Sequence, residues 1–210
     1  MLVIAGPSAV GKTTVSDEIL RQNIKFTLIR SATTRSPRGD GHDGEYLYFT
    51  KEDFLREIAS GGMLEYAEYS GSLYGTPKSE LLRAEREGKI PLLILELSGV
   101  GAVRSSEYSR GALCVYLYDS LDVLEARLYE RYMTPESSYG REKFEKRSAQ
   151  NITDYLGLTE RAGMFDLVLS NATPAEQTAR AILDAMDGKT LPTDKSKTLL
   201  LLADMARSRL

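Results

Sequence analysis

The chain has 210 residues, of which 42% are hydrophobic and 27% charged, and these values are typical of a globular protein that buries a sizeable core. A net charge of −3 gives no reason to expect nucleic acid or an anionic membrane as a partner, and no apolar stretch is long enough to span a membrane. Cys114 is the only cysteine, which favours a buried strand residue in a reducing compartment, so we expect a cytoplasmic protein.

Strand-like and helix-like segments alternate along the chain, which predicts an α/β fold with a parallel sheet. We expect strands at 2–5, 26–29, 90–97, 113–118 and 165–169, with helices at 13–21 and 119–133 between them. Ser120 is placed to cap the second of these helices. Thr173 and Glu176 flank Pro174 in a pattern that predicts a capping box before a last helix, which Gly188 would end.

The clearest motif is GPSAVGKT at residues 6–13, between the first strand and the first helix. It matches the pattern G-x-x-x-x-G-K-[ST], whose glycines let the loop curl and point its N–H groups at phosphate oxygens. We expect Lys12 to reach the β- and γ-phosphates and Thr13 to ligate Mg²⁺. The motif predicts a site for a nucleoside triphosphate, with the candidate residues Gly6, Pro7, Ser8, Ala9, Val10, Gly11, Lys12, Thr13 and Thr14.

Residues 31–89 differ from the rest because they are rich in aromatic residues and punctuated by glycine. This composition predicts a small inserted subdomain of antiparallel strands and a helix. Arg35 and Arg38 lie around Pro37 and could hold a phosphate, since guanidinium groups match phosphate oxygens. Downstream, residues 65–78 place a carboxylate, a hydroxyl and tyrosines on a predicted hairpin.

Four motifs, in this order and spacing, resemble those of the guanylate kinase family: GPSAVGKTT at 6–14, SATTRSPR at 31–38, YLYF at 46–49 and LEYAEYSGSLYGTPK at 64–78. The similarity continues more weakly through FDLVLSN at 165–171 and covers residues 1–188. The resemblance implies an α/β P-loop kinase fold, with a five-stranded parallel sheet core flanked by helices, a small mixed α/β GMP-binding insert and a mobile lid. It also implies transfer of the γ-phosphoryl group of ATP to GMP, giving ADP and GDP.

On this resemblance, the core comprises residues 1–30, 90–131 and 148–188, the insert residues 31–89 and the lid residues 132–147. Ser31, Arg35, Arg38 and Tyr74 match positions that hold the GMP phosphate, whereas Glu65 and Thr76 match positions that recognise guanine. Guanine presents two N–H donors to a carboxylate, and adenine lacks that pair. Glu96 stands where the family usually has a second guanine-recognising aspartate.

Further arginines should close over the transferring group from the lid, because phosphoryl transfer depends mainly on positioning and charge neutralisation. Arg127 and Arg131 are one helical turn apart and resemble the first lid arginines of the family. The segment that follows is longer than is usual in the family, so Arg141 and Arg147 are rival candidates for the third.

Two departures from the family pattern leave the acceptor open. In an ungapped comparison the tyrosine that contacts the GMP phosphate falls at Leu47, and only a one-residue slip would bring the flanking Tyr46 or Tyr48 to that contact. The first aspartate of the strand motif falls at Ile94. A P-loop kinase for another small phosphorylated acceptor is therefore an alternative. A catalytically inactive protein-binding module is a further alternative, although the intact Lys12 and Thr13 oppose it.

The tail, residues 189–210, is expected to be helical. Its apolar run at 198–202 predicts docking on the body of the protein or on a second copy in a homodimer.

Overall fold

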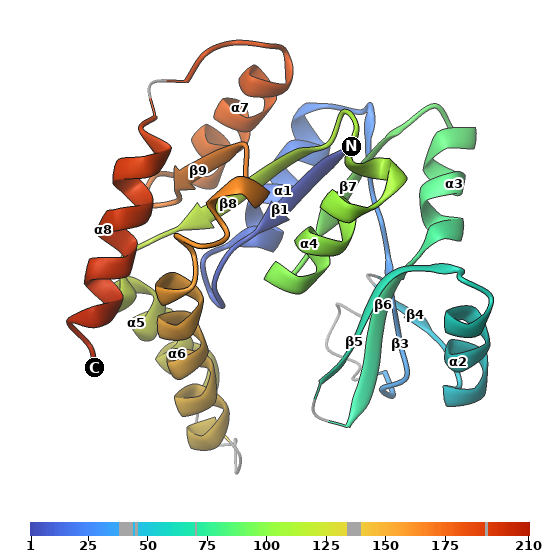
Figure 1. Cartoon of the computed structure of the whole chain (residues 1–210), viewed down its shortest axis with the longest axis horizontal. Helices are drawn as coiled ribbons and strands as arrows, with labels where there is room; N and C mark the ends of the chain where they lie inside the picture. Colours follow the sequence, from blue (N-terminus) through green and yellow to red (C-terminus); the bar gives the residue numbers. More distant parts are fainter. Residues whose placement is uncertain (38–43, 45, 70, 134–139, 192) are drawn as a thin grey trace.

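The computed structural model of the chain contains a five-stranded parallel sheet flanked by helices and a separate four-stranded sheet (Figure 1). The structure describes residues 1–37, 44, 46–69, 71–133, 140–191 and 193–210. In spatial order, the larger sheet comprises β2 (Phe26–Leu28), β7 (Ile90–Ile94), β1 (Leu2–Ala5), β8 (Leu113–Tyr118) and β9 (Leu167–Ser170). Every residue of β1 is fully buried, as expected for a central parallel strand covered on both faces. The α/β fold is therefore confirmed.

Seven helices belong to this part of the described chain: α1 (Lys12–Gln22), α3 (Lys78–Arg86), α4 (Leu97–Ser105), α5 (Leu121–Tyr132), α6 (Gly140–Leu156), α7 (Ala175–Met186) and α8 (Lys195–Arg207). Two short 3-10 turns add to them, at Glu107–Ser109 and Ala162–Met164. Helix α1 packs against α7, and α6 packs against both α5 and α8. Near the start of β8, Cys114 is fully buried and forms no disulfide, and its burial raises the pKa of the thiol.

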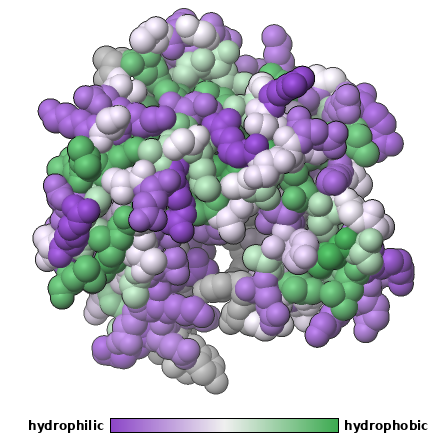
Figure 2. All heavy atoms as spheres, viewed as in Figure 1, coloured by the Kyte–Doolittle hydropathy of each residue, from purple (hydrophilic) through white to green (hydrophobic). Residues whose placement is uncertain are grey.

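The smaller sheet is formed by β4 (Tyr46–Tyr48), β3 (Ser31–Thr33), β6 (Ser72–Pro77) and β5 (Met63–Tyr69), in that order. Strand β3 runs parallel to β4 and antiparallel to β6, while β5 and β6 form the predicted hairpin. Helix α2 (Lys51–Ala59) accompanies this sheet, which has its own small core of Ala32, Phe54 and Met63, whereas α3 buries Leu81 and Ala84 in the core of the larger sheet. Figure 2 shows this part and the free end of α6 as two lobes separated by a notch, with mostly hydrophilic side chains over α6.

Three local expectations were wrong. The last strand begins at Leu167 and not at residue 165. The strand expected at 90–97 ends at Ile94, because the chain turns into α4 with Glu96 as its N-cap residue. The apolar sequence runs on past the end of the strand because Leu95 is buried and Leu97, the first residue of α4, packs against the core. The capping box at α7 does not form either: Pro174 is the N-cap residue, and no side chain caps the helix. By contrast, the Ser120 cap is confirmed, since its Oγ accepts a hydrogen bond from Val123 N–H at 3.3 Å.

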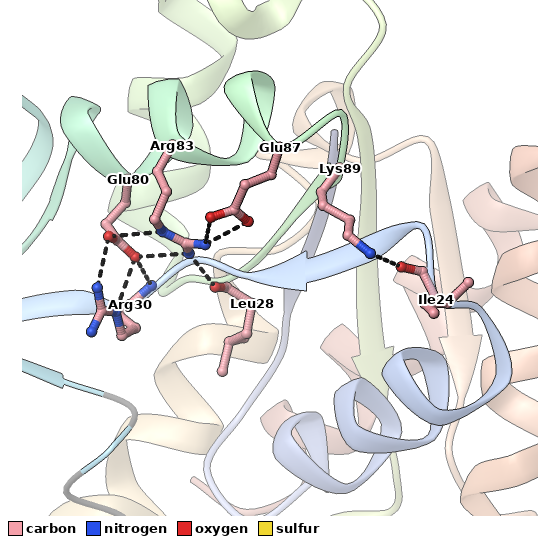
Figure 3. Close-up of polar contacts among 7 residues, drawn as sticks. All are labelled: Ile24, Leu28, Arg30, Glu80, Arg83, Glu87 and Lys89. Carbon is pink, nitrogen blue, oxygen red and sulfur yellow. Dashed lines mark hydrogen bonds and ion pairs between the residues drawn. The ribbon is translucent and has the colours of Figure 1, made fainter.

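An ion-pair cluster around the buried Glu80 joins the two sheets where the chain passes from β2 to β3 (Figure 3). Glu80 of α3, only 5% exposed, accepts hydrogen bonds from the backbone N–H and the guanidinium of Arg30 at 3.0–3.3 Å. Arg83 donates to the same carboxylate at 3.1 Å and to the carbonyl of Leu28 at 3.3 Å. Burial alone would raise the pKa of Glu80, but these hydrogen bonds outweigh it and lower the pKa to about 2. The cluster thus fastens the start of α3 to the crossing between the sheets.

The tail forms α8, which docks on the body of the protein through Leu199, Leu202, Ala203 and Ala206. Arg209 then forms ion pairs with Asp122 and Glu125 of α5. Leu200 and Leu201 stay exposed. Within the described part of the chain, no helix is long and apolar enough to cross a membrane.

Candidate active site

The phosphate-loop motif occupies the turn between β1 and α1. Gly6 and Gly11 have positive φ angles of 153° and 96°, in the region that favours glycine. A Cβ atom on Gly6 would lie 2.5 Å from the carbonyl oxygen of Leu117, and one on Gly11 would lie 2.7 Å from Nδ2 of Asn171. Both glycines are therefore required by close packing as well as by backbone conformation, and the loop takes the curled form that the motif predicts.

Lys12 folds back over this loop, with its ammonium donating to the carbonyl oxygens of Gly6 at 2.7 Å and Pro7 at 3.1 Å. Burial lowers the pKa of Lys12, while the carboxylates of Glu96 and Asp154 act in the opposite direction. Glu96 is thus an electrostatic partner of the phosphate-loop lysine, and its predicted contact with guanine stays a prediction. Phosphate oxygens entering the loop would supply Lys12 with stronger, charge-assisted acceptors.

The residues around Thr13 fit a Mg²⁺ ion that arrives with a nucleotide. Thr13 and Thr14 are exposed in the first turn of α1, directly after Lys12. No group of three or more His, Cys, Asp or Glu in the described chain could hold a metal ion by itself. Mg²⁺ commonly takes one or two oxygens from the protein and the rest from phosphates and water, so this small donor set is compatible with it.

The structure separates the candidate lid arginines. Arg127 forms an ion pair with Asp119 at 3.2 Å and donates to the carbonyl of Ala9 at 3.3 Å, so it contacts the phosphate loop. Arg147 also reaches this loop, with Nη1 donating to Oγ of Ser8 at 3.0 Å. Arg131 is exposed, but it lies near enough to lower the pKa of Lys12, as does Arg147.

Arg141, in contrast, is largely exposed to solvent. Its side chain is 77% exposed, and its nearest carboxylate is Glu145 of the same helix at 3.9 Å. Of the expected lid, residues 134–139 lie outside the described chain, and 140–147 form the first half of α6. The geometry therefore favours Arg147 over Arg141 for the third arginine.

One face of the small sheet gathers the residues expected to hold the acceptor phosphate. The guanidinium of Arg35 lies 4.9 Å from the ring centre of Tyr46 and 5.7 Å from that of Tyr48. The rings of Tyr46 and Tyr74 meet edge to face, with centres 6.4 Å apart. Ser31 pairs with Tyr46 in the strand ladder, while Arg38 lies outside the described residues.

The side chain of Leu47 lies on the other side of the strand from the residues expected to hold the phosphate, which favours the one-residue slip over the ungapped alignment. Its side chain packs against the insert core formed by Ala32, Phe54 and Met63. Because side chains alternate along a strand, its neighbours Tyr46 and Tyr48 face the opposite side, beside Arg35. Tyr46, which also meets Tyr74, is the residue of this strand that lies with the candidate phosphate ligands.

Glu65 and Thr76 lie opposite each other on β5 and β6, and Oγ1 of Thr76 donates to Oε1 of Glu65 at 2.7 Å. Burial raises the pKa of Glu65, whereas the bond from Thr76 lowers it. A Cβ atom on Gly99 would lie 3.5 Å from the carboxyl carbon of Glu65, so the start of α4 passes close to this pair. The structure thus brings together the two residues expected to recognise guanine, at a site that is partly shielded from solvent.

Two asparagines that the sequence analysis missed hold the phosphate loop. Asn151 of α6 exchanges hydrogen bonds with the backbone of Ser8, and Asn171 donates to the carbonyl of Val10 at 2.7 Å. Asn171 follows the last parallel strand, where ligand-binding residues of such sheets gather, so its position was a usable signal. Asn151 sits within a polar helix and carries no such signal.

Comparison with known proteins agrees with this geometry. A family model described as guanylate kinase matches residues 1–187. The chain belongs to the guanylate kinase family. A guanylate kinase from Synechococcus sp. is 40% identical over 142 residues, which cover 67% of this chain and 77% of that protein. A guanylate kinase from Sus scrofa is 34% identical over 175 residues, covering 81% and 83%.

A crystal structure of guanylate kinase from Anaplasma phagocytophilum has the same fold, with a TM-score of 0.62. It is 23% identical to this chain, and the match covers 92% of this chain and 87% of that one. The family match ends at residue 187, so helix α8 lies beyond it.

Proposed function

We propose that the chain transfers the γ-phosphoryl group of ATP to GMP, giving ADP and GDP, as its membership of the guanylate kinase family indicates. The observation that carries this proposal is the combination of two sites in one molecule. A complete phosphate loop holds Lys12 on the core, and the half-buried carboxylate of Glu65 is bonded to the buried hydroxyl of Thr76 on the insert. The former suits a triphosphate donor, and the latter suits a base with two adjacent N–H donors.

On the donor side, the N–H groups of the loop and the ammonium of Lys12 would hold the β- and γ-phosphates. Thr13 would hold Mg²⁺, which neutralises charge on the transferring group when it is bound. Arg127 and Arg147 already contact the loop and would stabilise the charge that develops during transfer, with Arg131 nearby. These residues position and neutralise, so no side chain needs to form a covalent intermediate.

On the acceptor side, Arg35, Tyr46 and Tyr74 would bind the GMP phosphate, together with Ser31 and Arg38 from the same part of the chain. Glu65 would accept from the N1–H and N2–H₂ of guanine, and Thr76 would hold the carboxylate in place. Adenine offers no such donors to a desolvated carboxylate, so AMP should be rejected. We propose residues 31–89 as the GMP-binding insert and residues 132–147 as the lid.

An ADP-release assay with ATP, Mg²⁺ and a panel of nucleoside monophosphates tests the proposal. We expect GMP to be the preferred acceptor, with Lys12→Ala reducing turnover to background as a control for contaminating kinases. Glu65→Gln should raise the Michaelis constant for GMP at least about tenfold and leave that for ATP unchanged, because a donor would then face the donors of guanine. Preference for another acceptor, or GMP use that does not depend on Glu65, would overturn the assignment.

A further inference from the structure

Asn151 is a buried polar residue of α6 whose carboxamide contacts a single residue of the phosphate loop. Its Oδ1 accepts from the N–H of Ser8 at 2.7 Å, and its Nδ2 donates to the carbonyl oxygen of Ser8 at 3.1 Å. The residue is 1% exposed. One helical turn earlier, Arg147 donates to the hydroxyl of the same serine at 3.0 Å. Helix α6 therefore makes three hydrogen bonds to Ser8.

The loop needs such support because its next residue is held in an unfavourable conformation. Ala9 has a φ of 66°, and it is the non-glycine residue with positive φ in the described chain. L residues avoid this region, and they persist in it only where the surrounding structure fixes them. Asn151 fixes the residue before Ala9, Arg127 binds the carbonyl of Ala9 itself, and Asn171 binds the carbonyl of Val10.

We propose that Asn151 is a positioning residue for phosphoryl transfer, an inference that rests on the function proposed above. By fixing both backbone groups of Ser8, it holds the next residues of the loop in the conformation that presents free backbone N–H groups to the phosphates of ATP. It also attaches α6 to the loop and so fixes the position of Arg147, on the same helix, relative to the phosphoryl group that the loop would hold. Asn151 itself touches neither substrate.

The chemistry of the carboxamide explains why the residue is an asparagine. A planar group with one acceptor and one donor side by side can pair with both the N–H and the carbonyl of a single residue. A carboxylate could not donate to the carbonyl, and an aliphatic side chain would leave both backbone groups unpaired in a buried place. Unpaired buried groups are costly, so the loop would shift to regain partners.

The test compares Asn151→Leu, which keeps the approximate volume, with Thr153→Leu, which makes the same kind of change at an exposed position of the same helix. Thr153 bonds only within α6, to the carbonyl of Ala149 at 3.1 Å. For Asn151→Leu we expect kcat/KM for ATP to fall by about ten- to a hundredfold, with a raised KM for ATP and a KM for GMP close to that of the parent. Thr153→Leu should match the parent.

Hydrogen exchange supplies a second measurement that does not depend on turnover. The amides of residues 8–10 should exchange at least about tenfold faster in Asn151→Leu, and ATP affinity measured by calorimetry should fall by the same factor as the raised KM. If the parent fails to phosphorylate GMP while this loss of ATP affinity is found, the proposed function fails and the positioning role stands.

A purely structural role predicts a different pattern. Asn151→Leu would then melt at a lower temperature and lose kcat through a smaller active fraction, while KM for ATP, ATP affinity and loop exchange stayed as in the parent. That pattern would overturn the proposal. Asn151→Ala serves as a second variant if the leucine proves too bulky to fold.

Discussion

Tyr46 and Leu47 are neighbours on β4, yet their side chains have opposite surroundings. Tyr46 lies beside Arg35 and Tyr74, and Leu47 lies in the insert core. We expect Tyr46→Phe to raise KM for GMP by about tenfold, because a hydrogen bond to a charged phosphate is lost, while KM for ATP stays unchanged. Steady-state kinetics with each substrate varied in turn checks this.

Leu47→Tyr provides the contrast. An extra hydroxyl and ring in a packed core should lower the melting temperature and bring no gain in GMP affinity. If this variant instead improved KM for GMP while Tyr46→Phe had no effect, the register of β4 described here would be wrong.

Glu80 shows how a single buried carboxylate links stability to pH. Its pKa is lowered from 4.5 to about 2 in the folded protein, so the unfolded chain binds a proton more readily below about pH 4.5. The contribution of Glu80 to stability is therefore fully present above that pH and is lost as the pH falls toward 2. We expect Glu80→Gln to lower the free energy of unfolding by about 1–3 kcal/mol at pH 7.

Denaturant unfolding at a series of pH values measures this effect. The difference between the parent and Glu80→Gln should shrink steadily below about pH 4.5. Glu87→Gln is the matched control, because Glu87 pairs with the same Arg83 but is largely exposed, and its effect should stay within about 0.5 kcal/mol. A difference that is constant from pH 7 to pH 3 would contradict the ion-pair explanation.

At the scale of elements, α6 carries both arginines that competed for one role. Arg147 contacts Ser8, and Arg141 lies two turns nearer the start of the helix in solvent. We expect Arg147→Ala to lower kcat by about a hundredfold or more, since a positioned donor to the transferring group is removed. Arg141→Ala should stay within about twofold of the parent. Equal losses in the two variants would show that the helix moves far enough on ATP binding to exchange their positions.

Elements formed by short, contiguous patterns could be predicted from the sequence. The phosphate loop is specified by residues 6–13 alone, and the Glu65–Thr76 pair follows from a hairpin whose two strands are close in the chain. The helix cap at Ser120 is equally local. Such features depend on neighbours along the chain, so their physics is visible in the residue order.

Other features depend on packing between distant segments and could not be predicted. The choice between Arg141 and Arg147 is settled by how α6 lies against Ser8, across 139 residues of sequence. The ungapped alignment put the family tyrosine at Leu47 because it counted residues along the chain. In the folded protein, packing of Leu47 against the core that contains Phe54 fixes which side of the strand faces inward. Asn151 bonds to the backbone of Ser8 across a similar separation in sequence, and one asparagine in a polar helix belongs to no sequence motif that would predict this contact.

At the scale of the whole molecule, α8 supports the helix that carries Arg147 and Asn151. It packs on α6 and β9, and Lys195 donates to the carbonyl of Phe165 at 2.9 Å. Removing residues 189–210 should lower the melting temperature by several degrees and speed hydrogen exchange in α6, because Leu199 and Leu202 no longer cover it. Removing only residues 208–210 deletes Arg209, whose surface ion pairs contribute little, and should change neither measurement appreciably.

The burial of Cys114 makes this chain convenient for site-specific labelling. The only thiol lies on β8 of the parallel sheet, where it is fully buried and its raised pKa keeps the thiolate fraction low. Maleimide dyes should therefore not react with Cys114. They should label cysteines introduced at exposed positions, such as Glu68 on the hairpin and Lys143 on α6. Energy transfer between the two dyes should increase more with ATP and GMP together than with either alone, and unchanged transfer would contradict closure of the insert and lid over the substrates.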